Sequence, residues 1–276
     1  MFFVGVFYAI RPLLKFFNYE YSDVCYLLIA LSICVVMILL RKRPKGIFSY
    51  RIYGTDASIE IVSGDIFKQK GAIVIPCNTS FDTKVNEQII SRKSVQGIFT
   101  NEVLNGDVAY LDEKINYQLR DIQYCKERTS MVGGNSKIYK MGTTIEIDWK
   151  DEKNKYYLLS MAELNEFGIA STDREKLVSA MEGLWDFIAT KSSLPDVINI
   201  PLLGTNFGRS NLNAYSTVLL IAMSYIKNRH ERALANKLRI IILDDVFFKH
   251  YEEIRRIQPI IKEFCNAPNL LKIFQS

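Results

Sequence analysis

One segment constrains this chain more than any other: residues 24–40 read VCYLLIALSICVVMILL, without a charge or a proline. A helix of roughly 20 apolar residues crosses a bilayer core, so this run predicts a membrane-spanning helix. A buried core helix or a signal-peptide core is the alternative, but RKRPK follows the run where a signal peptide has small residues. Lys and Arg are enriched on cytoplasmic flanks, so the chain after residue 45 is expected in the cytoplasm.

A second apolar segment, MFFVGVFYAIRPLLKFF, occupies residues 1–17. Arg11 and Lys15 interrupt it, and Pro12 removes a helix hydrogen bond in its middle. Two interpretations stay open: a second spanning helix, which gives a helical hairpin, or a segment lying on the membrane surface. We favour the hairpin. Charged residues in the apolar layer are tolerated when helices assemble around them, which makes an oligomeric pore a hypothesis.

The composition limits the remaining classes of function. The chain has 276 residues, 49% hydrophobic and 24% charged, which is enough for one globular domain beside an anchor. We therefore expect an anchor over 1–45 and a single folded domain over 46–276. The net charge of +5 is spread among acidic residues except beside the apolar run, so no nucleic-acid partner is expected. Five cysteines without a CxxC pair and two histidines predict no metal site.

After residue 50, β-like runs alternate with helix-like runs, which predicts an α/β domain with helices on both faces of a sheet. The expected strands are Ser58 to Val62, Ala72 to Pro76, Ser136 to Ile147 with a turn near Gly142, Tyr156 to Met161, Val197 to Pro201 and Leu238 to Leu243. The expected helices are Lys84 to Ser91, Gln96 to Leu104, Val108 to Tyr124, Asp173 to Lys191, Leu212 to Asn228 and Phe247 to Cys265.

Ligand sites of open α/β sheets form at the carboxyl ends of the strands, so the loops there are the candidates. Asp65, followed by Ile66, comes directly after the strand SIEIV, where its carboxylate can accept from an adenine amino group or cap a turn. Asn78 comes two residues after the expected strand AIVIP, where its amide can bind ribose hydroxyls or form a turn. Cys77 beside it is expected to be a small buried residue rather than a nucleophile.

The third loop is Leu203-Gly204-Thr205-Asn206-Phe207-Gly208-Arg209, between the strand VINIP and a predicted helix. Two glycines let several backbone N–H groups face one point, and the helix N-terminus favours a phosphate. Phe207 offers a face for stacking, and Arg209 can neutralise a phosphate.

In order and spacing, the segments SGDIF (63–67), AIVIPCNTS (72–80) and IPLLGTNFGRS (200–210) resemble the macro domain family over roughly residues 50–270. The resemblance implies a three-layer α/β/α fold with a mixed sheet. It also implies that Asp65 binds adenine, Asn78 binds the distal ribose, Gly204 to Gly208 bind the pyrophosphate, and Phe207 flanks the distal ribose.

This sequence departs from the family pattern at several points. FDTKVNEQIISRKSVQGIF (81–99) stands where the family has a glycine-rich first phosphate loop, and within it Ser94-Val95-Gln96-Gly97 are expected to open a helix toward the ligand. Ile75 replaces one asparagine, and the aspartate of the hydrolytic subfamilies has no counterpart. We therefore expect a binding domain without catalytic residues or a cofactor. The alternative is a membrane-tethered ADP-ribosyl hydrolase that uses Asn78 with Asp82 or Asp107 as general base.

A divergent macro-like domain behind two apolar segments resembles the membrane effector of type II Thoeris antiphage defence. That resemblance implies a nucleotide signal, ADP-ribose or histidine-ADP-ribose, which a partner TIR-domain enzyme makes from NAD. It also implies a multi-pass protein of the cell inner membrane that forms a homo-oligomer on activation and disrupts the membrane.

Overall fold

The structure is a computed structural model that describes residues 29, 31–33, 47–129, 132–149, 154–191, 193–203 and 213–267. The chain divides into two units, Met1–Lys45 and Gly46–Ser276, and each is considered by itself. Most of the predicted spanning run at 24–40, and all of residues 1–17, lie outside the described residues. Within the part of the chain that is described, no helix has the length and apolar character needed to cross a membrane.

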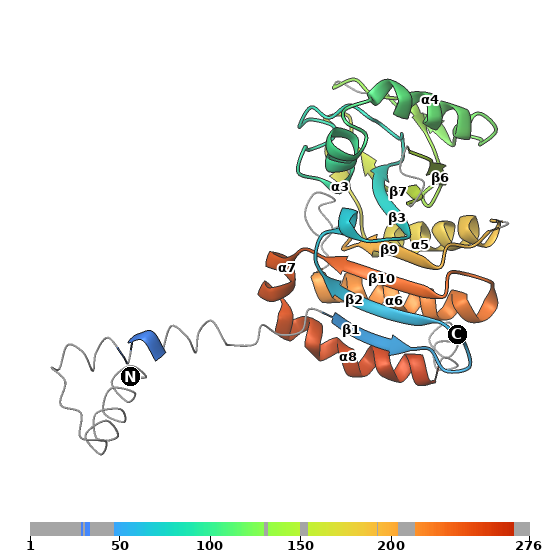
Figure 1. Cartoon of the computed structure of the whole chain (residues 1–276). Coiled ribbons are helices and arrows are strands. Elements are labelled where there is room, and N and C mark those ends of the chain that lie inside the picture. Colours follow the sequence, from blue (N-terminus) through green and yellow to red (C-terminus); the bar gives the residue numbers. More distant parts are fainter. Residues whose placement is uncertain are drawn as a thin grey trace, which may run out of the picture. The chain divides into compact units, whose positions relative to one another are not determined.

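The second unit is built on a mixed sheet, which in the described residues has eight strands in the order β1-β2-β10-β9-β3-β7-β6, with β8 paired to β7 (Figure 1). The strands are β1 (Ile47–Arg51), β2 (Ser58–Ser63), β3 (Ala72–Asn78), β6 (Thr144–Ile147), β7 (Tyr156–Leu164), β8 (Ala170–Ser171), β9 (Val197–Pro201) and β10 (Lys237–Ile242). The inner strands β2, β10, β9, β3 and β7 run parallel, and β1, β6 and β8 run antiparallel to their neighbours. A separate small ribbon pairs β4 (Lys126–Glu127) with β5 (Lys137–Ile138).

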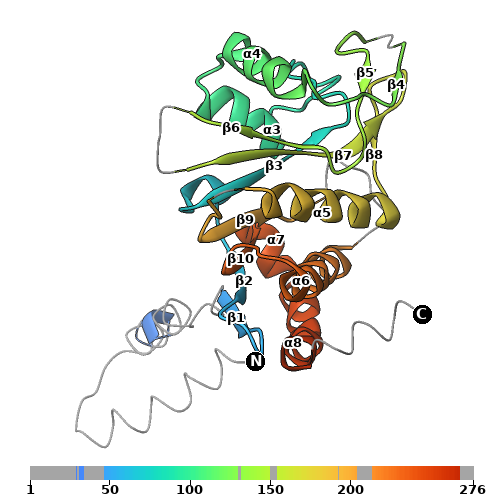
Figure 2. The same cartoon turned by 90° about the vertical axis from the view of Figure 1, so that its right-hand side faces the viewer.

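Helices cover both faces of the sheet, so the expected three-layer α/β/α arrangement is confirmed. The helices are η1 (Ile66–Lys68), α3 (Val95–Ile98), η2 (Phe99–Val103), α4 (Val108–Leu119), α5 (Arg174–Ala189), α6 (Ala214–Glu231), α7 (Asp244–Lys249) and α8 (Tyr251–Asn266). One apolar core joins the sheet to α5, α6 and α8, and a second joins its other face to η2 and α4. After a quarter turn, α5, α6 and α8 lie together on one side of the strands (Figure 2).

Strand β3 shows why its apolar run has no polar alternation. Ala72 and Val74 belong to the core with α5 and α6, whereas Ile73, Ile75 and Cys77 belong to the core with α4. Successive side chains of a strand point to opposite faces, so a central parallel strand is apolar on both.

Helix α5 follows its sequence signals closely. Asp173 is its N-cap and accepts a hydrogen bond from the Lys176 N–H at 2.8 Å. An apolar stripe recurs at helical spacing along α5 and is buried in the core: Leu177, Met181, Leu184, Trp185 and Ile188.

Four predicted elements are corrected. The segment Lys84 to Ser91 is not helical but a loop with an isolated bridge between Val85 and Ile90. Ser136 to Ile147 is not one hairpin, because β5 and β6 belong to different sheets on either side of Gly142. The helix expected to reach Tyr124 ends at Leu119, and the helix expected over Phe247 to Cys265 is two helices, α7 and α8.

Candidate functional site

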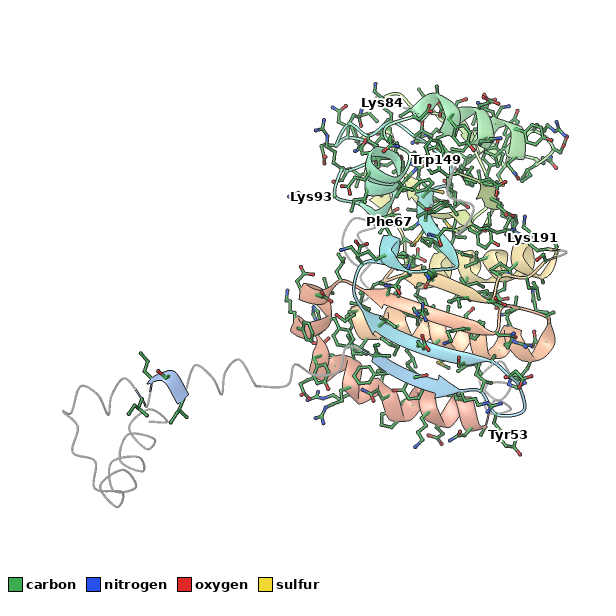
Figure 3. All side chains as sticks on the ribbon, in the orientation of Figure 1. Tyr53, Phe67, Lys84, Lys93, Trp149 and Lys191 are labelled. Carbon is green, nitrogen blue, oxygen red and sulfur yellow. The ribbon has the colours of Figure 1, made fainter. Side chains whose placement is uncertain are left out.

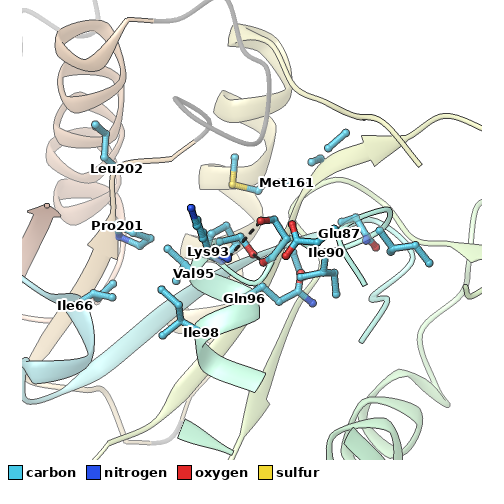
Figure 4. Close-up of a pocket in the computed structure, with 18 of the residues that line it drawn as sticks. Ile66, Glu87, Ile90, Lys93, Val95, Gln96, Ile98, Met161, Pro201 and Leu202 are labelled. Atoms are coloured by element: carbon cyan, nitrogen blue, oxygen red, sulfur yellow. Dashed lines mark hydrogen bonds between the residues drawn. The ribbon is translucent and has the colours of Figure 1, made fainter. Parts of the chain in front are cut away.

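A cavity of about 860 Å³ opens at the carboxyl ends of β2, β10, β9, β3 and β7. This volume falls within the range of about 300–1,000 Å³ that is usual for small-molecule sites. In the close-up, Ile66 and Pro201 lie on one side of it and Glu87 and Ile90 on the other (Figure 4). The position at the strand ends is the one expected from the sequence.

Asp65 and Ile66 lie at the β2 end of the cavity. Asp65 is the N-cap of η1, and its Oδ1 accepts from the Phe67 N–H at 2.9 Å. Its Oδ2 lies 3.8 Å from Lys68 Nζ, and the side chain is 43% exposed. Asp65 therefore caps a turn and still presents a carboxylate oxygen at a cavity wall that Ile66, Ile242 and Leu243 make apolar.

Asn78 lies at the β3 end of the cavity, where the β3–β7 pairing is irregular. Cys77 pairs with Ser160, but Asn78 pairs with Ala162, so Met161 is an extra residue on β7. A bulge of this kind bends a strand and re-aims its side chains. Asn78, Met161 and Ala162 all line the cavity.

The orientation of the Asn78 amide is fixed by its own turn. Its Oδ1 accepts from the backbone N–H of Ser80 at 3.1 Å and from that of Asp82 at 3.2 Å. Since a nitrogen could not accept these bonds, the oxygen must face the turn. Nδ2 makes no hydrogen bond to the described residues and remains a donor for the cavity, where Asn78 is 5% exposed.

The segment in place of the family's first phosphate loop brings a helix start to the cavity wall. Ser94 is the N-cap of α3, and its Oγ accepts from the Gly97 N–H at 3.0 Å. Ser94, Val95 and Gln96 line the cavity, so the start of α3 lies at its wall. Gln96 also donates from Nε2 to the Asp82 carbonyl at 2.7 Å.

Two of the predicted ligand residues in the described part of the chain, Gly97 and Leu203, do not line the cavity. A Cβ at Gly97 would lie 2.1 Å from the Ser91 carbonyl oxygen, so this glycine allows a close backbone approach. Leu203 is fully buried in the core with α5 and α6, and its neighbour Leu202 lines the cavity instead. The remaining predicted ligand residues, Gly204, Thr205, Asn206, Phe207, Gly208 and Arg209, lie outside the described residues.

Among the described lining residues, the charged ones are Asp65, Glu87, Lys93 and Glu102. A hydrogen bond from the Arg92 N–H, together with one from Ser91, lowers the pKa of the Glu87 carboxyl, so Glu87 is ionised at neutral pH. In the view of all side chains, Lys93 and Phe67 lie toward the carboxyl-end edge and Lys191 toward the opposite edge (Figure 3). Among the described residues that line the cavity, Lys93 is the one lysine or arginine.

Sequence reasoning did not identify Glu87, Lys93 or the β7–β8 hairpin as parts of the site. Phe167 lines the cavity from the tip of this hairpin and is 56% exposed. The Asn165 side chain accepts from the N–H of Phe167 and of Ile169, and Gly168 follows at a positive φ. An Asn and a Gly between apolar residues are turn signals that could have revealed this hairpin.

The two candidate general bases have other roles. Asp82 is 1% exposed and holds Arg128 at 2.7 Å, and Asp107 is the N-cap of α4. Neither lines the cavity. Burial, and then the Asp82 charge, raises the pKa of the Cys77 thiol, so Cys77 is a buried neutral thiol as expected. Within the described residues, no group of three or more His, Cys, Asp or Glu is placed to hold a metal.

Three comparisons place this geometry among known proteins. A family model described as the macro domain of Thoeris protein ThsA matches residues 59–243. A curated relative, Thoeris protein ThsA of Bacillus amyloliquefaciens (strain Y2), is 26% identical over 187 residues, which cover 66% of this chain and 60% of that protein. This chain therefore matches less than two thirds of that relative's length.

One solved structure shows the same fold. A point variant of the Oceanobacillus iheyensis macrodomain superposes with a TM-score of 0.51 at 14% identity, covering 76% of this chain and 96% of that one. Another structure of that macrodomain, with ADP, has a TM-score of 0.44 at 13% identity over the same shares of the two chains.

Proposed function

Because this chain belongs to the Thoeris ThsA macro domain family, we propose that its cavity binds a nucleotide of the ADP-ribose type. One observation carries the proposal: Asp65 and Asn78 lie at separate strand ends of a single cavity, with β10 and β9 between their strands. Neighbouring strands are about 4.8 Å apart, so the two ends are separated by about 14 Å of sheet. An elongated ligand with a base at one end and a sugar at the other suits this spacing.

Each end offers the chemistry that its part of the ligand needs. At the β2 end, an apolar wall with Ile66 and Ile242 suits a flat base, and the Asp65 carboxylate suits an exocyclic amino group. At the β3 end, the Asn78 Nδ2 is a donor for a ribose hydroxyl. The pyrophosphate is assigned to Gly204 to Gly208 by sequence alone, outside the described residues.

Beyond Asn78, Glu87 and Lys93 line the cavity from the loop that replaces the family's first phosphate loop. Their opposite charges suit the amino and carboxylate groups of an amino acid joined to the distal ribose. This favours histidine-ADP-ribose, made from NAD by a TIR-domain enzyme, over ADP-ribose alone. The site would then act as a signal receptor rather than as a catalyst.

Binding is tested with the purified full-length chain and the substitution Asn78→Ala. A hydrogen bond contributes about 0.5–1.5 kcal/mol, so the affinity for ADP-ribose should fall about 2- to 13-fold. The affinity for ADP, which lacks the distal ribose, should change less than about twofold. Asn228→Ala, at a fully buried asparagine of α6, is the matched control that should preserve both affinities.

Equal loss of ADP and ADP-ribose binding in Asn78→Ala would contradict the assignment of the distal ribose to Asn78. Release of product from an ADP-ribosyl substrate by the wild-type chain would instead support the hydrolase alternative. The partners of Asp82 and Asp107 do not favour that alternative.

We further propose that the nucleotide drives assembly of a multi-pass inner-membrane effector through residues 1–45. The support is the uncharged run at 24–40, its basic flank and the interrupted segment before it. A ligand shifts such an equilibrium only if it binds the assembled state more tightly. Particle mass measured by light scattering should therefore rise when ligand is added to the full-length chain, and one unchanged mass would refute this assembly step.

A further inference from the structure

The turn that follows Asn78 contains a strained residue. Phe81 has φ +51°, a left-handed conformation that is costly for a bulky side chain. The Phe81 side chain is fully buried. Its ring packs edge-on against Tyr139, with ring centroids 5.7 Å apart. Such a conformation persists only where the surrounding structure over-determines it, and it occurs preferentially near functional sites.

This same turn orients the Asn78 amide. The backbone N–H groups of Ser80 and Asp82 both donate to Asn78 Oδ1, and Ser80 Oγ lies 3.2 Å from the same oxygen. Only the turn brings these donors together. If the turn relaxes, the amide can rotate and Nδ2 no longer has a fixed direction in the cavity. Whatever holds the turn therefore acts on the ligand through Asn78.

A buried ion pair holds the turn from outside the cavity. The Asp82 carboxylate accepts from Arg128 Nη2 at 2.7 Å, from the Asn135 N–H at 2.6 Å and from Ser80 Oγ at 3.0 Å. Asn135 Nδ2 donates in turn to the Ser80 carbonyl at 3.0 Å and to the Phe81 carbonyl at 3.1 Å. Arg128 and Asn135, which follow β4, thus hold the turn by hydrogen bonds to the Asp82 side chain and to the turn's backbone carbonyls.

The backbone at Gly134 packs closely against the Asp82 carboxylate. A Cβ at Gly134 would lie 2.4 Å from Asp82 Oδ1, so only a glycine leaves room for the carboxylate. Arg128 is 9% exposed, and its Nη1 is buried with no hydrogen-bond partner among the described residues. A buried ion pair gives little net stability over apolar packing, and one with an unsatisfied donor gives less. The Arg128–Asp82 pair is therefore better explained by its selecting one conformation of the turn than by a contribution to the stability of the fold.

We propose that Arg128 is a positioning residue for the ligand: by holding Asp82, it fixes the strained turn that aims Asn78 Nδ2 into the cavity. Neither Arg128 nor Asp82 lines the cavity, so the effect is indirect. The proposal rests on the proposed function, because it assigns Asn78 to the distal ribose.

The test compares the affinities of the full-length chain for ADP-ribose and for ADP in the variants Arg128→Met and Arg128→Lys. Of the two nucleotides only ADP-ribose carries the distal ribose assigned to Asn78, so Arg128→Met should lower the ratio of the two affinities about 2- to 13-fold, the contribution of one hydrogen bond. Arg128→Lys keeps the charge but loses the planar guanidinium, so it should restore part of the ratio. Ser80→Ala, a milder change in the same network, should lower the ratio less and covers the case in which Arg128→Met does not fold.

Arg239→Met is the matched control, because Arg239 is also a poorly exposed arginine paired with a carboxylate, Glu60, at 2.9 Å. It should lower the melting temperature and leave the ratio unchanged. An unchanged ratio in the folded Arg128 and Ser80 variants, with wild-type binding intact, would overturn the positioning role alone. Failure of the wild-type chain to bind ADP-ribose would instead overturn the proposed function.

Discussion

Asn78 carries two roles that its sequence context presents as alternatives. It forms a turn through Oδ1 and also lines the cavity, and the turn is what leaves Nδ2 free for a ligand. Asp65 behaves in the same way, because one carboxylate oxygen caps η1 while the residue lines the cavity. At these two positions, the residue type together with a strand end was enough to predict a residue that lines the cavity.

Other predicted site residues depended on how deeply each side chain is buried, which the sequence does not give. Asn78 is the last residue of β3, whereas Leu203 lies two residues beyond the end of β9. Leu203 is buried in the core, and its neighbour Leu202 lines the cavity. Gly97 stands within the helix start expected at the ligand, yet its missing Cβ admits the Ser91 carbonyl. Tertiary packing, and not the local sequence pattern, decides which of two neighbouring residues faces the cavity.

Glu60 provides a residue-scale prediction about stability. Burial raises the pKa of its carboxyl, but hydrogen bonds and charges from Lys237 and Arg239, at 2.7 and 2.9 Å, outweigh burial and lower it below the ordinary value of 4.5. A lowered carboxyl pKa stabilises the fold above the unfolded-state pKa, and this stabilisation is lost as pH falls through the folded-state pKa.

Glu60→Gln should therefore lower the free energy of unfolding by about 1–3 kcal/mol near neutral pH. The difference from wild type should shrink as the pH falls below the ordinary value of 4.5. Denaturant unfolding of both chains across this range measures it. A difference that stays constant with pH would show that the ion pairs of Glu60 do not stabilise the fold.

At the scale of elements, the central strands and α5 could be predicted because their signals are strong. The apolar runs at 72–76 and 156–161 have few polar positions, as strands buried on both faces require. Asp173 marks the start of α5, and an apolar stripe follows at helical spacing. These elements define the sheet edge at which the cavity forms.

The segment 84–91 could not be predicted, because side chains compete there with helical hydrogen bonds. Asn86 Oδ1 accepts from the N–H groups of Gln88 and Ile89, and Glu87 has φ +63° and accepts the Arg92 N–H. Asn is known to offer the backbone such alternatives. The resulting loop brings Glu87 and Lys93 to the cavity, so the same departure from a helix creates this part of the site.

The strand β1 was also missed, although its exposure alternates along Ile47–Arg51. It follows directly on the basic linker, where the sequence signal for a membrane flank dominates. Phe48 packs against Phe247 and Tyr251, so the strand is fixed by contacts far along the chain. Long-range contacts of this kind leave no local signature.

For the whole molecule, the order of three short motifs predicted the fold that the sheet and the family match establish. The separate segment 1–45 and its place in a membrane remain predictions from composition. The curated relative is matched over 60% of its length, so the match does not assign that whole protein's activity to this chain.

The central claim is that the cavity receives an ADP-ribose-type signal, and one calorimetric titration tests it most directly. The purified full-length chain is titrated with histidine-ADP-ribose and, separately, with ADP-ribose. We predict saturable binding of both, with the histidine conjugate tighter because only it carries amino and carboxylate groups that can pair with Glu87 and Lys93, which line the cavity. Absence of heat with either nucleotide, from a chain shown to be folded, would contradict the account.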